Sequence, residues 1–107
     1  MVLFRRLLGE TLRQVRLERG MTLRDVSAEA RVSLGYISEI ERGQKEASSE
    51  LLASLCTALE MPLSDVLREV STAVAVEEAA VEEAALATAA TPIKVAPRSG
   101  DVVASAA

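Results

Sequence analysis

The chain has 107 residues, which suits one domain with an appended element, and its net charge is -4. Half of the residues are hydrophobic but only 2% are aromatic, so a core must be built from Leu, Val, Ile and Ala, as in small helices packed on each other. One Cys and no His exclude a disulfide within the chain and a Cys/His zinc site. We expect no cofactor.

Three helices are predicted in the first part of the chain, over residues 3–19, 23–30 and 34–42. Gly20 and Gly43 supply stop signals for the first and third helices. The predicted N-cap residues are Thr22, which forms a near capping box with Asp25, and Ser33. The apolar residues at helical spacing are Leu8, Leu12, Val15, Val26, Ala30, Val32, Ile37 and Ile40.

Two further helices and a tail follow. Ser48 or Ser49 caps a fourth helix with Leu52, Leu55 and Leu59 as its apolar stripe. Pro62 breaks the chain, and the fifth helix is predicted to begin near Asp65 after an N-cap at Ser64, with Val66, Leu67 and Val70 as its first apolar residues. Ala and Glu favour its extension to about residue 88. Pro92, Pro97 and Gly100 predict a disordered tail over residues 91–107.

The second and third helices have the spacing of a helix-turn-helix, about residues 22–42, whose second helix enters the DNA major groove. Several side chains on that helix can reach bases: Leu34 a thymine methyl, and Ser38 and Glu39 base edges. Gly35 would allow a close approach, and Ser33 directs the first turn, where N–H groups can receive a phosphate. Leu34 could instead be a partly covered apolar residue, and Glu39 a solvated charge.

Other side chains suit the DNA backbone or the core. Tyr36 could donate its hydroxyl to a phosphate or pack on the second helix, and Arg42 and Lys45 would supply positive charge to phosphates. Arg16 and Glu41 fall where the first and third helices should meet, so we predict a structural ion pair between them.

The distribution of charge favours nucleic acid more than the total does. Residues 5–45 carry a net charge of about +3, whereas residues 46–90 carry about -8. The first ten residues lack the pattern of a secretory signal, and no apolar run reaches the length of a membrane span. We expect a cytoplasmic, nucleoid-associated protein with no membrane partner.

The sequence "TLRQVRLERGMTLRDVSAEARVSLGYISEIERGQKEASSELLASLCTALEMPLSDVL", residues 11–67, resembles the Cro/CI-type (XRE family) helix-turn-helix domain. The resemblance implies an all-α, five-helix, lambda repressor-like fold, with residues 1–10 as the beginning of the first helix. One departure is Ala47, where many members carry Pro. The predicted DNA-contacting residues, with those added by the resemblance, are Thr22, Leu23, Arg24, Ser33, Leu34, Gly35, Tyr36, Ser38, Glu39, Arg42 and Lys45.

Within this family, "ARVSLGYISEIERGQKEASSELLASLCTALEMPL" resembles regulators of Clp protease genes. That resemblance implies a transcriptional activator of protease and chaperone genes that is itself degraded by the Clp protease, and the tail ending in "ASAA" is similar to Ala-ending degradation signals. An activator would also contact RNA polymerase. The alternatives are a repressor, or an antitoxin or other protein-interaction module. An enzyme is disfavoured because Cys56 has no candidate base beside it and no phosphate loop is present.

The segment of residues 68–90 is predicted to form a dimerisation helix, because an Ala- and Val-faced helix should not stand alone in water. The predicted interface comprises Leu67, Val70, Val74 and Val81. The alternatives are a helix that folds back onto the chain's own domain and a frayed helix formed by high intrinsic propensity. A homodimer would match a palindromic DNA site with half-sites about one helical turn apart.

Overall fold

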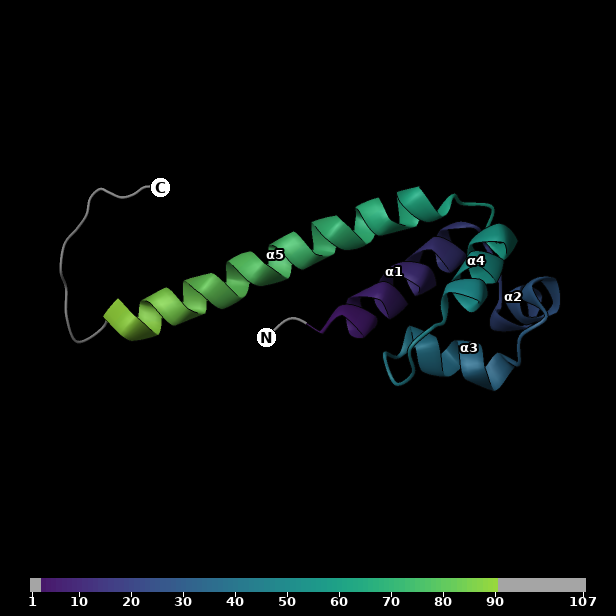
Figure 1. Ribbon diagram of the computed structural model, residues 1–107, viewed down its shortest axis with the longest axis horizontal. Helices are drawn as coiled ribbons and strands as arrows, with labels where there is room; N and C mark the ends of the chain where they lie inside the picture. Colours follow the sequence, from purple (N-terminus) through teal and green to yellow (C-terminus); the bar gives the residue numbers. More distant parts are fainter. Residues whose placement is uncertain (1–2, 91–107) are drawn as a thin grey trace. The chain divides into compact units, whose positions relative to one another are not determined.

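The computed structural model describes residues 3–90, and the side chains of residues 3–88. Its helices are α1 (Phe4–Glu18), α2 (Leu23–Ala30), α3 (Leu34–Glu41), α4 (Ser49–Ala58) and α5 (Leu63–Ala90) (Figure 1). These five helices, with no strand in the described range, confirm the all-α prediction. The predicted tail and degradation signal, residues 91–107, lie outside that range. No helix within it is long and apolar enough to span a membrane.

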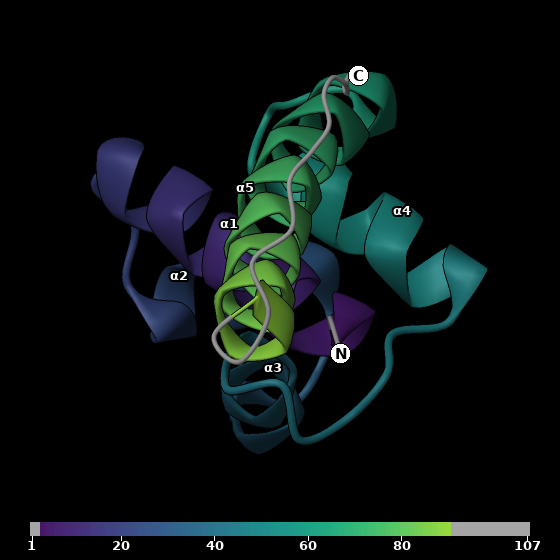
Figure 2. The same ribbon diagram turned by 90° about the vertical axis from the view of Figure 1, so that its left-hand side faces the viewer.

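The described chain divides into two compact units between residues 76 and 77, so α5 begins in the first unit and ends in the second. In the first unit, α3 lies below α1 in both views (Figures 1 and 2) and contacts it. The helix α2 contacts both α3 and α4. The first four helices therefore form one packed body that holds α3 in place.

The core of the first unit is aliphatic, as its composition predicts. Its most deeply buried side chains are Val15, Val26, Ile37, Ile40, Leu55, Val66 and Val70. The predicted stripe residues Ala30, Val32 and Leu52 are only partly buried and pack against this core. Apolar residues from all five helices thus pack into one core, and burial of these side chains stabilises the first unit.

The helix starts agree with the predicted caps except at α5. The hydroxyls of Thr22, Ser33 and Ser48 each accept a backbone N–H from the first turn of their helix, which selects Ser48 over Ser49 for α4. The prediction that Ser64 caps the fifth helix is wrong. The carbonyl of Pro62 accepts the N–H groups of Asp65 and Val66, so Ser64 lies inside the first turn.

A close approach of α1 to α3 depends on Gly9. A Cβ atom at this position would lie 2.2 Å from the carbonyl oxygen of Ile40 and 2.7 Å from that of Glu41. Any side chain would collide with backbone, which cannot move aside as a flexible side chain can. Gly9 therefore sets the distance at which α3 docks on α1.

Candidate nucleic-acid interface

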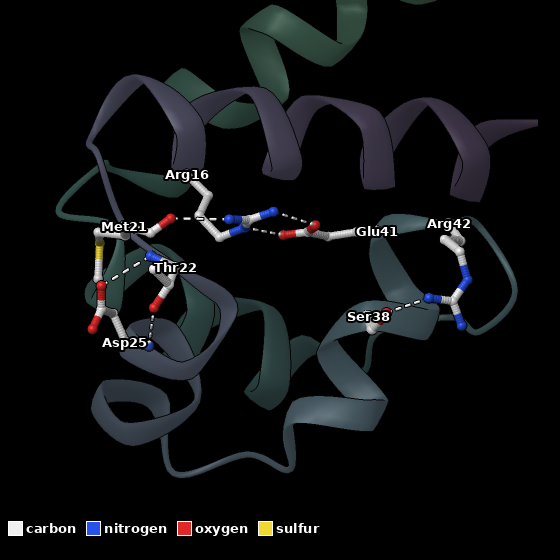
Figure 3. A network of polar contacts seen from close by, with 7 residues as sticks. All are labelled: Arg16, Met21, Thr22, Asp25, Ser38, Glu41 and Arg42. Atoms are coloured by element: carbon white, nitrogen blue, oxygen red, sulfur yellow. Dashed lines mark hydrogen bonds and ion pairs between the residues drawn. The ribbon is translucent and has the colours of Figure 1, made fainter.

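The helix α2 begins with a complete capping box. The Thr22 hydroxyl accepts the Asp25 N–H at 3.0 Å, and the Asp25 carboxylate accepts the Thr22 N–H at 2.9 Å (Figure 3). These hydrogen bonds, first from the Thr22 backbone and then from its side chain, lower the pKa of Asp25 below its ordinary value. The first turn of α2 is thereby fixed, and Arg24 projects from it as an exposed cation.

The turn between α2 and α3 is closed by Ser27. Its carbonyl oxygen accepts the N–H of Arg31 at 2.9 Å and that of Val32 at 3.2 Å, and its hydroxyl donates to the Val32 carbonyl at 2.5 Å. Arg31 adopts the left-handed conformation, with φ 59° and ψ 47°. This geometry ends α2 and directs the chain into the N-cap of α3 within two residues.

A buried ion pair ties α1 to the last turn of α3. Arg16 Nε lies 2.7 Å from Glu41 Oε2 and Arg16 Nη2 lies 3.1 Å from Glu41 Oε1, a two-bond pairing of guanidinium and carboxylate (Figure 3). The two side chains are only 10% and 7% exposed. Arg16 Nη1 also donates to the Met21 carbonyl at 2.9 Å, so the pair connects α1, α3 and the segment before α2.

The first turn of α3 faces solvent. Ser33, Leu34 and Gly35 are all exposed, and a Cβ atom added to Gly35 would meet nothing within 4 Å. The opposite face of the helix carries Ile37 and Ile40 into the core. With one face buried and its last turn held by Glu41, α3 offers its N-terminal end to a partner.

The C-terminal end of α3 carries a positioned arginine. Arg42 Nη1 donates to the Ser38 hydroxyl (Figure 3). Arg42 Nη2 donates to Gln44 Oε1 at 3.2 Å. Both bonds lie at the surface, and Arg42 forms no ion pair with an acidic residue in the described part of the chain. Its guanidinium is thus oriented while its positive charge remains available to an anion.

Tyr36 is partly buried, packs against the core, and donates its hydroxyl proton to the Glu46 carbonyl at 3.2 Å. Packing against the protein was one of the two alternatives for this side chain, and the contact with a phosphate stays a prediction. Tyr36 holds the loop between α3 and α4.

The remaining predicted DNA-contacting residues lie on α2, on α3 and in the loop after α3. Leu23 and Glu39 are partly buried, and Lys45 is exposed in the loop after α3. Sequence reasoning missed Arg5, whose Nε donates to the Gly43 carbonyl at 2.8 Å and which therefore fastens α1 to the same loop. The sequence did carry a sign of the role of Gly9. Glycine is unfavourable inside a helix, so its presence there indicates that a neighbouring segment comes too close for a side chain.

The four predicted dimer residues fall into different environments. Val70 is only 2% exposed within its own unit, so its assignment to a dimer contact is corrected to a core residue. Val74 is partly buried against the same core. Leu67 and Val81 are 42% and 43% exposed. The sequence could not separate these residues because all of them follow one helical spacing.

The comparison with known families decides the class of the protein. Residues 7–70 match the model of a helix-turn-helix domain. The chain belongs to the helix-turn-helix family. It is a DNA-binding transcription regulator of the ClgR type, with the Cro/CI-type fold that its sequence predicted.

Three relatives define this similarity. The transcriptional regulator ClgR of Mycobacterium tuberculosis is 57% identical over 76 residues, which cover 71% of this chain and 68% of the relative. The crystal structure of the clp gene regulator ClgR from Corynebacterium glutamicum matches with a TM-score of 0.75 and 45% identity, over 85% of this chain and 97% of that one. The restriction-modification controller protein C.AhdI from Aeromonas hydrophila matches with a TM-score of 0.55 and 26% identity, over 62% and 94% of the chains.

The helices α2 and α3 and the turn closed by Ser27 all lie within the matched residues 7–70. The named ClgR relatives are a transcriptional regulator and a clp gene regulator.

Proposed function

We propose that this chain activates genes for proteases and chaperones of the clp type by binding a palindromic operator as a homodimer. The relative from Corynebacterium glutamicum is described as a clp gene regulator, and the match to it extends over most of both chains. The observation that carries the proposal is the solvent-facing first turn of α3 on a helix whose opposite face and last turn are fixed.

Sequence recognition is assigned to the exposed face of α3. Gly35 lets the backbone approach base edges, and Leu34, 39% exposed, can contact a thymine methyl. The Glu39 side chain has no polar partner among the described residues, so its carboxylate can accept a hydrogen bond from cytosine N4. Ser33 and Thr22 cap the two helices while remaining exposed, which leaves their first turns open to phosphates.

Contacts with the DNA backbone are assigned to Arg24, Arg42 and Lys45. All three are exposed, and Arg42 is oriented by Ser38 and Gln44. Such contacts fix the register of the protein on DNA and release counterions, so they strengthen binding to every sequence.

Dimerisation is assigned to exposed apolar side chains of α5. Leu67 and Val81 remain candidates, whereas Val70 and most of Val74 are covered within the first unit. One helix-turn-helix reads about half of a site, and a twofold pair reads both halves.

Activation would require a contact with RNA polymerase. The Asp25 carboxylate is engaged in the capping box, while the Glu29 side chain, four residues later, is exposed and has no polar partner within residues 3–88. Glu29 is therefore the acidic side chain on α2 that is available for such a contact. Turnover by the Clp protease is assigned to the sequence of residues 91–107, which ends in "ASAA".

Selection of bound duplexes from a random DNA pool, using the full chain, tests the proposal. We expect a palindromic site whose half-site centres are about one helical turn apart. Recovery of asymmetric sites would contradict the dimer, and recovery of no enriched sequence would contradict specific regulation. Transcription from a promoter carrying the selected site then separates an activator from a repressor.

One substitution on α3 and one at the residue that follows it distinguish recognition of bases from binding to the DNA phosphates. Arg42→Ala should weaken binding to all sequences about five-fold near 0.15 M salt and lower the salt slope by about one. Glu39→Ala should instead change the base preferred at one position of the selected site. An unchanged site, bound equally well by Glu39→Ala, would exclude direct recognition by Glu39.

A further inference from the structure

Arg31 adopts a conformation that its residue type disfavours. Its φ of 59° and ψ of 47° are left-handed, a region in which the Cβ atom of any residue other than glycine crowds the following carbonyl. The turn itself explains the conformation, because the Ser27 carbonyl accepts the N–H groups of both Arg31 and Val32. The turn does not explain the arginine, since these bonds involve only backbone of residue 31 and would form equally with glycine.

A second residue in the same conformation provides an internal comparison. Glu60 ends α4 with φ 56°, and Arg31 and Glu60 are the two positive-φ residues other than glycine in the described chain. The side chain of Glu60 lies 4.0 Å from Arg19, whose Nη2 also donates to the Glu60 carbonyl at 2.9 Å. Glu60 thus has a charge partner inside the chain.

Arg31 has no such partner. It is exposed, and its side chain forms no hydrogen bond or ion pair with the residues that the structure describes. An arginine that crowds the backbone without an internal contact indicates an external one. Its guanidinium keeps a positive charge and can donate N–H groups to phosphate oxygens, and the charge alone, as on lysine, also suffices to attract a phosphate.

The position of Arg31 identifies the class of that anion. It lies two residues before Ser33, the N-cap of α3, and therefore beside the exposed first turn that the proposed function directs into the major groove. The hydrogen bonds of Ser27 hold this backbone, so the side chain starts from a fixed point. A DNA strand bordering that groove would carry phosphates beside this turn.

We infer that Arg31 is a phosphate-binding residue that clamps the helix-turn-helix turn to the DNA backbone and fixes how deeply α3 enters the groove. This inference rests on the proposed DNA-binding role of α3. It adds a contact at the turn, separate from those of Arg42 and Lys45 at the other end of the helix.

The test compares Arg31→Ala and Arg31→Lys in the full chain. Both variants retain a Cβ atom in the left-handed conformation, but only lysine retains the charge. Binding to a fluorescein-labelled duplex carrying the selected site and to one of arbitrary sequence is measured between about 0.05 and 0.3 M salt. Arg31→Ala should bind both duplexes about five-fold more weakly near 0.15 M, with a salt slope lower by about one, whereas Arg31→Lys should stay within about two-fold of the parent.

Glu60→Gly and Arg31→Gly form a matched control for backbone strain. Both relieve a left-handed residue and should raise Tm, but only Arg31→Gly should weaken DNA binding. If the parent binds DNA and Arg31→Ala matches its affinity and salt slope, the phosphate contact is wrong while the proposed function stands. If the parent binds neither duplex, the proposed function fails and this inference fails with it.

Discussion

The two parts of α5 carry apolar residues at the same helical spacing, but these residues are buried in one part and exposed in the other. Val66 and Val70, in the first unit, are 0% and 2% exposed, whereas Val81 and Leu86, in the second, are 43% and 63% exposed. The first part is held by the shared core. The second part is rich in Ala and Glu, whose helix propensity favours the same backbone without tertiary contacts.

This difference separates two kinds of residue that look alike in the sequence. A valine in the packed part contributes to folding, and a valine in the exposed part is available to a partner. Substitutions in the packed region should therefore change the free energy of unfolding, while those on exposed faces should change binding or assembly. The following predictions test that division.

The largest expected effect is at the buried ion pair. Arg16→Met leaves the Glu41 carboxylate buried without its partner, which should lower the free energy of unfolding by about 3–5 kcal/mol in urea denaturation. The double variant Arg16→Met/Glu41→Leu removes both charges and should recover most of that loss. A double variant as unstable as the single one would show that the pair is needed for more than mutual neutralisation.

Two helical glycines provide the next comparison. Gly9→Ala places a Cβ atom 2.2 Å from the Ile40 carbonyl oxygen, so we expect a loss of about 3 kcal/mol in thermal or urea unfolding. Gly35→Ala meets no atom and should leave stability unchanged or raise it by up to about 1 kcal/mol. It should nevertheless weaken DNA binding if the backbone of α3 approaches the bases. Equal stability of the two variants would contradict the tight docking of α1 on α3.

The division within α5 is tested by two valines. Val70→Ala creates a cavity in the core and should cost about 2 kcal/mol of unfolding free energy. Val81→Ala should change that free energy by less than about 0.5 kcal/mol when measured at a concentration where the chain is monomeric. Sedimentation equilibrium should then show weaker self-association for Val81→Ala. Unaltered association would remove Val81 from the dimer contact.

The smallest effect concerns pH and the capping box. Hydrogen bonds from Thr22 hold the folded pKa of Asp25 below its ordinary value of 3.8, so the carboxylate stabilises the fold fully above that value. This contribution is lost as the pH falls through the lower folded pKa. The Tm of Asp25→Asn should therefore lie below that of the parent at pH 7, and the difference should shrink as the pH falls below 3.8. If the difference in Tm stayed the same at every pH, the effect of the substitution would not come from the charge of the Asp25 carboxylate.

Much of the candidate interface could be predicted from the sequence because its helix caps and its buried face depend on residues only a few positions apart. The caps of Thr22 and Ser33 depend on hydrogen bonds that span three residues, and both appeared where expected. The spacing of Ile37 and Ile40 identified the buried face of α3, and hence its exposed face. The family resemblance added the DNA-binding role.

Other properties depended on residues that are distant in the sequence. Tyr36 gives its hydroxyl to Glu46, and Val70 enters a core built from all five helices, so neither role follows from helical spacing. The need for Gly9 arises from the carbonyl of Ile40, thirty-one positions later, and the start of α5 from the carbonyl of Pro62. The sequence by itself determined which segments are helical and which face of each is apolar, because those properties depend on neighbours a few residues away. Only the tertiary structure decided which apolar residues are buried together, which polar groups are already paired and which charges remain for a partner, because burial and pairing depend on how the helices pack.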